Sequence, residues 1–256
     1  MTNISKQKHI ALWTCPRSRS TLMARSFEQR SDCLVFDEPF YASYLLKHGY
    51  HHPHREKILD VCESDHYNIK EYLTNPLPGH IRFGFQKHNA RNILPEFGTD
   101  WFPEHHIFLL RDPKDIILSL QKIIGKEISA YDIDIKSLYN IFENVVVKMK
   151  KKPLVINSDD FLKYPSVILK KICDKFDIPF DESMLHWKYG LQDSKLFFSG
   201  QLFPYSDIWY GGIKESTGFK PYDKKKSNLP EKFRAILDVC MPIYHKLLSS
   251  KFIVTI

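Results

Sequence analysis

The sequence lacks the features that mark secreted and membrane-spanning proteins. It has only 5 cysteines in 256 residues and no Cys-x-x-Cys pair, which favours free thiols in a reducing compartment over a disulfide framework. No run approaches the roughly 20 apolar residues that a membrane-spanning helix needs. Residues 1–8 are polar, unlike the apolar core of a signal peptide. We therefore expect a cytoplasmic protein with no membrane partner.

A concentrated basic arm is also missing. The 37 lysines and arginines exceed the 30 aspartates and glutamates by 7, a balance that favours anionic partners such as nucleotides. Two lysine runs, at 148–152 and 224–226, are typical of a solvated surface. Because no nucleic-acid-binding motif accompanies them, we expect no nucleic-acid partner. The sequence indicates no particular oligomeric state.

Short apolar runs alternate with segments of helical periodicity. This alternation predicts a three-layer α/β/α fold with a mostly parallel central sheet of about five strands. The expected strands are 10–14, 33–36, 81–86, 106–110 and 154–156. The expected helices are 21–30 and those that begin near Pro113, Pro165 and Pro230. With no internal repeat or low-complexity linker, residues 1–256 are expected to form a single domain.

Two stretches, 46–79 and 186–222, lack clear periodicity and are expected to be loops. In an open α/β sheet, loops at the carboxyl ends of strands build the ligand site. We therefore expect these insertions to form a lid and part of the acceptor site. The second stretch is dense in aromatic residues, which fit either core packing or an acceptor wall: Trp187, Phe197, Phe198, Phe203, Tyr205, Trp209 and Tyr210.

The segment Thr14–Thr21 follows the first expected strand and opens the first expected helix. A helix start presents backbone N–H groups and a positive dipole end, which suit a phosphate. Arg17 and Arg19 would add charge there, and Ser18 would add a hydroxyl donor. The segment lacks the glycines and the lysine of a Walker A loop, which argues against an ATP or GTP hydrolase.

Two blocks of sequence resemble PAPS-dependent sulfotransferases, where PAPS is 3′-phosphoadenosine 5′-phosphosulfate. Pro16–Thr21 resembles the 5′-phosphosulfate loop of that family, and Phe108–Ser119 resembles its 3′-phosphate motif, with a serine eight residues after an arginine. A weaker third block, 155–160, is similar to the strand on the adenine side. The resemblance is closest to a bacterial small-molecule branch, through three further blocks at 37–41, 86–88 and 216–219.

The resemblance implies a P-loop NTPase-like fold and transfer of a sulfuryl group from PAPS to a hydroxyl or amine of a small-molecule acceptor. PAP (3′-phosphoadenosine 5′-phosphate) would be the product, the acceptor would be a natural-product alkaloid, and no metal would be needed. The residues implied at the donor are Arg17, Ser18, Arg19, Ser20 and Thr21 at the 5′-phosphate, and Arg111 and Ser119 at the 3′-phosphate. Lys214, Ser216 and Thr217 would either complete the 3′-phosphate pocket or form a surface turn.

The general base has two candidates, Glu38 and His88. A histidine suits base catalysis near neutral pH without adjustment, whereas a glutamate needs its pKa raised by burial. Arg17 is expected to stabilise charge on the leaving phosphate, and Lys87 is a second candidate for that role. Four histidines at 48–54 match no zinc spacing, so no metal site is expected.

The sequence departs from the family pattern at three places. Arg19 stands where the family commonly has glycine, Leu22 replaces an aromatic residue that stacks on adenine, and the family's Lys-x-His is here the adjacent pair Lys87-His88. Two alternatives therefore accompany the sulfotransferase hypothesis. One is a P-loop-type small-molecule kinase, and the other is a non-catalytic nucleotide-binding protein.

Overall fold

The computed structural model describes residues 7–49, 54–124, 127–191, 207–224 and 227–256. Their centre is a five-stranded sheet in the order β2-β3-β1-β4-β5, with every neighbouring pair parallel. The strands are β1 (Lys8–Thr14), β2 (Cys33–Asp37), β3 (Phe83–Asn89), β4 (His105–Leu110) and β5 (Leu154–Asn157). The prediction of an α/β fold around a mostly parallel five-stranded sheet is confirmed.

Helices cover both faces of the sheet, because side chains alternate across each strand. On one face, Ile10 and Leu12 of β1 join a core with Phe27 of α1. On the other face, Ala11 and Trp13 of β1 join a separate core. The first face is covered by α1 (Ser20–Glu28), α8 (Ser158–Lys163) and α9 (Pro165–Lys175), and the second by α5 (Pro113–Ile124), α7 (Ile135–Glu143) and α11 (Arg234–Leu248).

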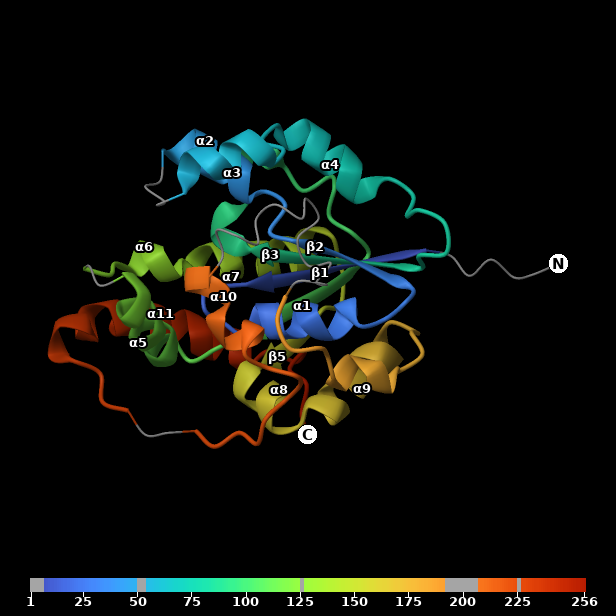
Figure 1. The fold of residues 1–256 in the computed structure, drawn as a ribbon. Coiled ribbons are helices and arrows are strands. Elements are labelled where there is room, and N and C mark those ends of the chain that lie inside the picture. Colours follow the sequence, from blue (N-terminus) through green and yellow to red (C-terminus); the bar gives the residue numbers. More distant parts are fainter. Residues whose placement is uncertain (1–6, 50–53, 125–126, 192–206, 225–226) are drawn as a thin grey trace.

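The segment 46–79, expected to be a loop, is largely helical. Three helices, α2 (Tyr41–His48), α3 (Arg55–Val61) and α4 (His66–Thr74), lie together at the top of Figure 1. Each is short, and α3 buries only Ile58 while α4 buries Ile69 and Leu73. One buried residue in α3 and two in α4 leave too little periodicity for a sequence pattern to indicate a helix.

The segment 186–222 also contains a helix, α10 (Asp207–Lys214). Of the aromatic residues expected to form either core packing or an acceptor wall, Phe197, Phe198, Phe203 and Tyr205 lie outside the described residues, as does the side chain of Trp209. Trp187 is buried in the described part, and Tyr210 reaches the end of β2 through a hydrogen bond to Asp37.

The remaining elements are short. They are the helix α6 (Ala130–Ile133), a π-helical turn (Asn144–Lys148), and 3₁₀ turns at Ala90–Asn92, Pro95–Phe97, Glu182–Leu185 and Glu231–Phe233. No helix in the described ranges is both long and apolar enough to cross a membrane.

Candidate active site

A pocket of about 470 Å³ lies at the carboxyl edge of the sheet. It is lined by the loop between β1 and α1, by the ends of β2 and β3, by Arg111 after β4, by α10 and by the segment that follows α10. The carboxyl ends of parallel strands lie at one edge of the sheet. Successive strands are added on opposite sides of β1, and the crevice at this switch brings together residues that are distant in sequence. The pocket therefore stands where open α/β sheets bind ligands.

The loop from Cys15 to Arg19 is shaped by two residues in the left-handed region. Arg17 has φ 59° and Arg19 has φ 69°, a conformation that costs a residue with a Cβ about 1–2 kcal/mol and glycine almost nothing. The usual glycine at position 19 in the family has this physical reason. The contacts of the Arg19 side chain with Asp159 and Tyr222 offset this backbone free-energy cost.

The hydroxyls predicted at the 5′-phosphate divide into two groups. Ser20 and Thr21, in the first turn of α1, line the pocket. Ser18 is fully buried, and its hydroxyl donates to the carbonyl of Cys15 at 2.7 Å. The side chain of Ser18 thus holds the loop in shape and does not face the pocket, unlike the expectation from sequence.

The two predicted phosphate motifs are physically joined. Arg17 Nε donates to Ser119 Oγ at 3.1 Å, and Arg111 Nη1 donates to the carbonyl of Arg17 at 2.6 Å. Residues expected at the 3′-phosphate therefore support the loop expected at the 5′-phosphate. Both arginines line the pocket.

Positive charge is crowded at this end of the pocket. Burial lowers the pKa of Arg17. Burial, with the nearby charge of Arg19, lowers the pKa of Arg111 to about 10. The buried Nε of Arg111 has no hydrogen-bond partner among the described residues. A bound oxyanion would supply both the missing acceptor and the balancing charge, so the residues fit a phosphate group.

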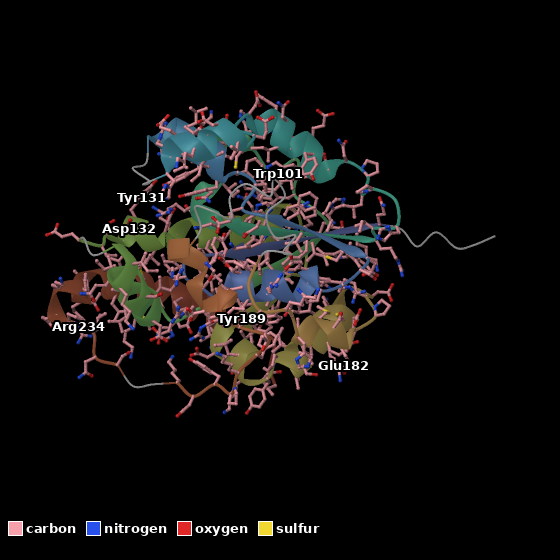
Figure 2. All side chains as sticks on the ribbon, viewed as in Figure 1. Trp101, Tyr131, Asp132, Glu182, Tyr189 and Arg234 are labelled. Atoms are coloured by element: carbon pink, nitrogen blue, oxygen red, sulfur yellow. The ribbon has the colours of Figure 1, made fainter. Side chains whose placement is uncertain are left out.

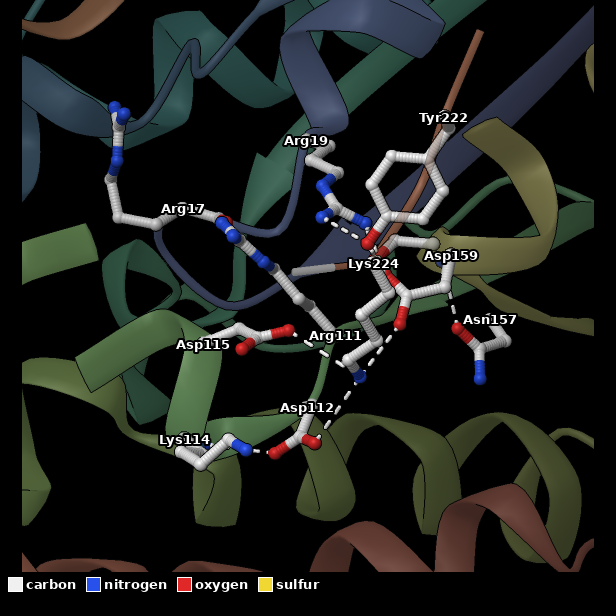
Figure 3. Close-up of polar contacts among 11 residues, drawn as sticks. Arg17, Arg19, Arg111, Asp112, Lys114, Asp115, Asn157, Asp159, Tyr222 and Lys224 are labelled. Atoms are coloured by element: carbon white, nitrogen blue, oxygen red, sulfur yellow. Dashed lines mark hydrogen bonds and ion pairs between the residues drawn. The ribbon is translucent and has the colours of Figure 1, made fainter. Parts of the chain in front are cut away.

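Arg19 turns away from the loop toward α8 (Figure 3). Its Nη1 lies 2.5 Å from Asp159 Oδ1, and its Nη2 donates to the hydroxyl of Tyr222 at 3.0 Å. The Tyr222 hydroxyl in turn donates to Asp159 Oδ1 at 2.7 Å. Lys224 Nζ lies 2.8 Å from the other oxygen of the same carboxylate.

The other end of the pocket holds a buried charged cluster. Lys87 Nζ lies 2.6 Å from Asp37 Oδ1 and donates to Glu38 Oε1 at 2.8 Å. Asn92 Nδ2 donates to the second oxygen of Glu38 at 3.1 Å, and the Tyr210 hydroxyl donates to Asp37 Oδ2 at 2.9 Å. The strand register explains the cluster, because Asp37 of β2 lies directly beside Lys87 of β3.

The cluster keeps its lysine charged. Burial alone would lower the pKa of Lys87, but the carboxylates of Asp37 and Glu38 outweigh burial and raise it above its usual value. The pKa of Asp37 is raised mainly by burial, against the opposing effect of Lys87. Burial and the same carboxylates hold the pKa of Tyr210 well above its usual value, so this phenol stays a donor.

His88 faces the opposite side of β3. Its ring stacks on Trp13 with a centroid distance of 4.7 Å and meets the edge of Trp101. The side chain is 1% exposed and does not line the pocket. Burial, and then the charge of Lys87, lowers the pKa of His88 to about 3. Of the two candidate bases, the structure therefore brings only Glu38 to the pocket.

The segment after α10 contributes to the pocket further along than expected. Ser216 lines the pocket, but its hydroxyl donates to Ile213 O and accepts from Trp187 Nε1. Neither Lys214 nor Thr217 is a lining residue. The loop expected from sequence ended at Gly218, which lines the pocket, and the lining residues Phe219–Tyr222 beyond it were not expected. We call residues 216–224 the strap.

Two lining residues beyond the expected end of the third strand were also missed. Asn89 ends β3, and Arg91 lies in the following 3₁₀ turn. Polar residues follow the apolar run of this strand, and they were interpreted as its end, although β3 continues to Asn89. Among the described residues, no group of three or more His, Cys, Asp or Glu side chains is arranged to hold a metal ion. His51 and His52 of the histidine-rich stretch lie outside those residues.

Two curated plant proteins match nearly the whole of this chain. Two Arabidopsis thaliana proteins, branched-chain-amino-acid aminotransferase-like proteins 2 and 1, are 31% and 30% identical to this chain over 239 residues. These matches cover 92% and 93% of this chain but only 40% and 41% of the plant proteins, so the chain spans about two fifths of their length.

A solved structure and a family model cover nearly the whole chain. The sulfotransferase domain of the Synechococcus PCC 7002 olefin synthase superposes with a TM-score of 0.53 at 15% identity, covering 93% of this chain and 96% of that domain. That likeness shows a shared fold. The family model described as a sulfotransferase domain matches residues 8–251. The chain therefore belongs to the sulfotransferase domain family.

Proposed function

We propose that this protein transfers a sulfuryl group from PAPS to a hydroxyl or amine of a small molecule. The observation that carries the proposal is the contact between the two motifs predicted to bind phosphate: Arg17 bonds to Ser119 and Arg111, and both arginines line one pocket that also holds the carboxylate of Glu38. PAPS would supply the sulfuryl group there: its bond from sulfur to the bridging oxygen breaks, the acceptor atom bonds to sulfur, and PAP leaves.

Different residues of the chain would bind the two phosphates and the adenine of the donor. Arg17, Ser20 and Thr21 would hold the 5′-phosphate, with Arg17 balancing the charge that grows on the leaving oxygen. Arg111 would hold the 3′-phosphate, which distinguishes PAPS from ATP. Phe219 and Tyr222 line the same pocket. They are candidates for stacking on adenine, the role that Leu22 cannot fill.

Glu38 is the proposed general base. It lines the pocket, and each of its oxygens accepts one hydrogen bond, from Lys87 and from Asn92. A carboxylate has about four lone-pair positions, so capacity remains to accept the proton of the attacking group. His88 has no comparable access.

Lys87 is better suited to hold Glu38 than to neutralise the leaving group. Its side chain is 2% exposed, and its ammonium already lies between two carboxylates. The positive charge is therefore balanced locally, and its effect is to fix the orientation of the base. We therefore assign the neutralisation of charge on the leaving phosphate to Arg17 and Arg111.

Calorimetric titration with PAP, ADP and AMP tests the donor assignment. We expect PAP to bind more tightly than the other two, and Arg111→Ala to weaken PAP roughly 10- to 150-fold, since a charged hydrogen bond contributes about 1.5–3 kcal/mol. Arg234→Ala is the matched control, because Arg234, labelled in Figure 2, is exposed at the start of α11 and does not line the pocket.

No preference for PAP over ADP would overturn the proposal. Mg²⁺-dependent ATP turnover would then support a kinase, and PAP binding with no transfer to any acceptor would support a non-catalytic role. With PAP binding in hand, acceptors are screened for sulfation among small hydroxyl and amine compounds, alkaloids included.

A further inference from the structure

One carboxylate, that of Asp159, joins two separate walls of the pocket. Asp159 lies in the first turn of α8, and its two oxygens meet three side chains: Arg19 at 2.5 Å, Tyr222 at 2.7 Å and Lys224 at 2.8 Å. Arg19 belongs to the phosphate loop, whereas Tyr222 and Lys224 belong to the strap. Figure 3 shows the three side chains converging on this residue.

The start of the strap is anchored separately, since Gly218 forms a backbone bridge with His186 and Phe219 packs edge-on against Phe161 of α8. Beyond Phe219 the structure assigns neither helix nor strand to the strap, and Tyr222 and Lys224 attach this part of it to Asp159. The loop carries the left-handed Arg19 in place of glycine. The contacts of Arg19 with Asp159 and with the Tyr222 ring, 4.8 Å from the guanidinium carbon, offset that backbone cost.

The charges at this junction are firmly held. Burial by itself would raise the pKa of Asp159, but hydrogen bonds from Lys224, Tyr222 and Arg19 outweigh burial and lower it to about 2. Lys224 also lies 3.4 Å from Asp112 and 3.5 Å from Asp115, the acids at the start of α5. It thereby balances negative charge beside a pocket proposed to bind an anion.

We propose that Asp159 is a positioning residue for the donor, holding the phosphate loop and the strap in one arrangement through Arg19, Tyr222 and Lys224. The inference rests on the proposed function, since the donor is the anion that both walls would contact. Residues 218–222 and the loop line the same pocket, so loss of the tie would loosen both surfaces at once.

The sign of the effect separates positioning from background charge. Asp159 is an anion next to a site for an anion, so removal of its charge alone would tighten PAP binding. If its function is to position the two walls, Asp159→Asn instead weakens PAP binding, because Arg19 and Lys224 lose their shared partner. The two explanations therefore predict opposite changes.

The experiment measures PAP affinity and dissociation rate for the full chain and for Asp159→Asn. Asp160→Asn is the matched control, since Asp160 is the next residue in the same turn and makes none of the contacts with Arg19, Tyr222 or Lys224 given for Asp159. We expect Asp159→Asn to weaken PAP about tenfold, mainly through faster dissociation. Asp160→Asn should leave affinity unchanged or tighten it slightly.

Two further variants guard against simple unfolding. Tyr222→Phe and Lys224→Met each remove one arm of the junction on the strap, far from the sheet core, and each should also speed PAP dissociation while the melting temperature without ligand stays close to that of the parent. Equal or tighter PAP binding by Asp159→Asn would overturn the inference alone. Failure of the parent chain to bind PAP would overturn the proposed function with it.

Discussion

Lys87 and His88 are neighbours in sequence, but they lie on opposite faces of β3 and their pKa values shift in opposite directions. Lys87 faces the pocket between the carboxylates of Asp37 and Glu38, which keep its charge. His88 faces an aromatic core against Trp13, which keeps it neutral. Both side chains are almost fully buried.

The difference shows that the partner decides what burial does to an ionisable group. Desolvation disfavours the charged form of both residues. Two carboxylates reverse that effect for Lys87, while the rings around His88 provide nothing that could. A strand alternates its faces, so only one of two adjacent residues can serve a pocket on one side. The predictions below break or sharpen this contrast, from the largest expected effect to the smallest.

On the pocket side of the sheet, Glu38→Gln should abolish most of the sulfuryl-transfer activity. Loss of a general base costs about 10²- to 10⁴-fold in kcat, whereas glutamine keeps the size of the side chain and the contact with Asn92. The measurement is kcat with a screened acceptor at saturating PAPS, together with PAP affinity. Glu182→Gln, at an exposed position labelled in Figure 2, is the control for loss of one negative charge. A decrease of less than about fivefold would remove Glu38 from the base role.

Lys87→Met should destabilise the fold. It leaves Asp37 buried without its cation, and removal of one member of a buried ion pair costs about 3–5 kcal/mol. Urea unfolding at pH 7 measures the change. Lys151→Met, which breaks the exposed pair with Glu104, is the control and should cost less than about 1 kcal/mol. Equal losses in the two variants would contradict the importance of burial for the pocket-side cluster.

Two histidines buried on the core side of the sheet, His88 of β3 and His106 of β4, should make the free energy of unfolding depend on pH. The folded-state pKa is about 3 for His88 and about 4 for His106, both through burial first, while the unfolded chain takes up these protons near pH 6.5. Stability from each neutral histidine is therefore fully present above pH 6.5 and decreases as the pH falls toward the folded-state pKa. The limiting slope is about 1.4 kcal/mol per pH unit for each histidine.

Comparison of the parent with His88→Phe isolates one of these histidines. Urea unfolding at pH 7, 6 and 5 should give a shallower loss of stability in His88→Phe, by up to about 1.4 kcal/mol per pH unit. His106, whose Nδ1 accepts from Trp13 Nε1 at 3.1 Å, remains as the internal reference. Identical pH dependence in the two proteins would mean that His88 is not the buried neutral group that the core implies.

Local signals in the sequence predicted the sheet and the phosphate loop, because strand, turn and helix follow one another along the chain. The third strand illustrates the limit. Its expected range stopped at 86, yet β3 continues through Lys87 and His88 to Asn89. These polar residues end an apolar run in sequence, but partners from other strands and helices satisfy them in the fold. Once the strand is extended, its alternation separates Lys87 from His88 without further information.

The strap could not be predicted in the same way. Its role depends on contacts such as Tyr222 with Asp159, 63 positions apart, and Arg19 with Tyr222, 203 positions apart. No local periodicity encodes such a contact. Arg17 and Arg111, the residues proposed to hold the donor, were found through motifs at strand ends, whereas Gly218–Tyr222 follow a helix and belong to no strand end. Sequence motifs therefore located the pocket edge, but they predicted a late contribution from Lys214, Ser216 and Thr217, of which only Ser216 lines the pocket.

The smallest expected effect is that of His88→Phe on catalysis. Since His88 lies behind the sheet from the pocket, its replacement by another aromatic ring should leave PAP affinity and kcat within about threefold, far from the roughly 10²-fold loss of a missing base. The measurement pairs kcat with its pH profile, because a packing defect lowers the amount of folded enzyme without moving the profile, whereas loss of a base removes its acidic limb. A loss above about 100-fold with that limb gone would transfer the base role from Glu38 to His88 and reverse the assignment of the two faces.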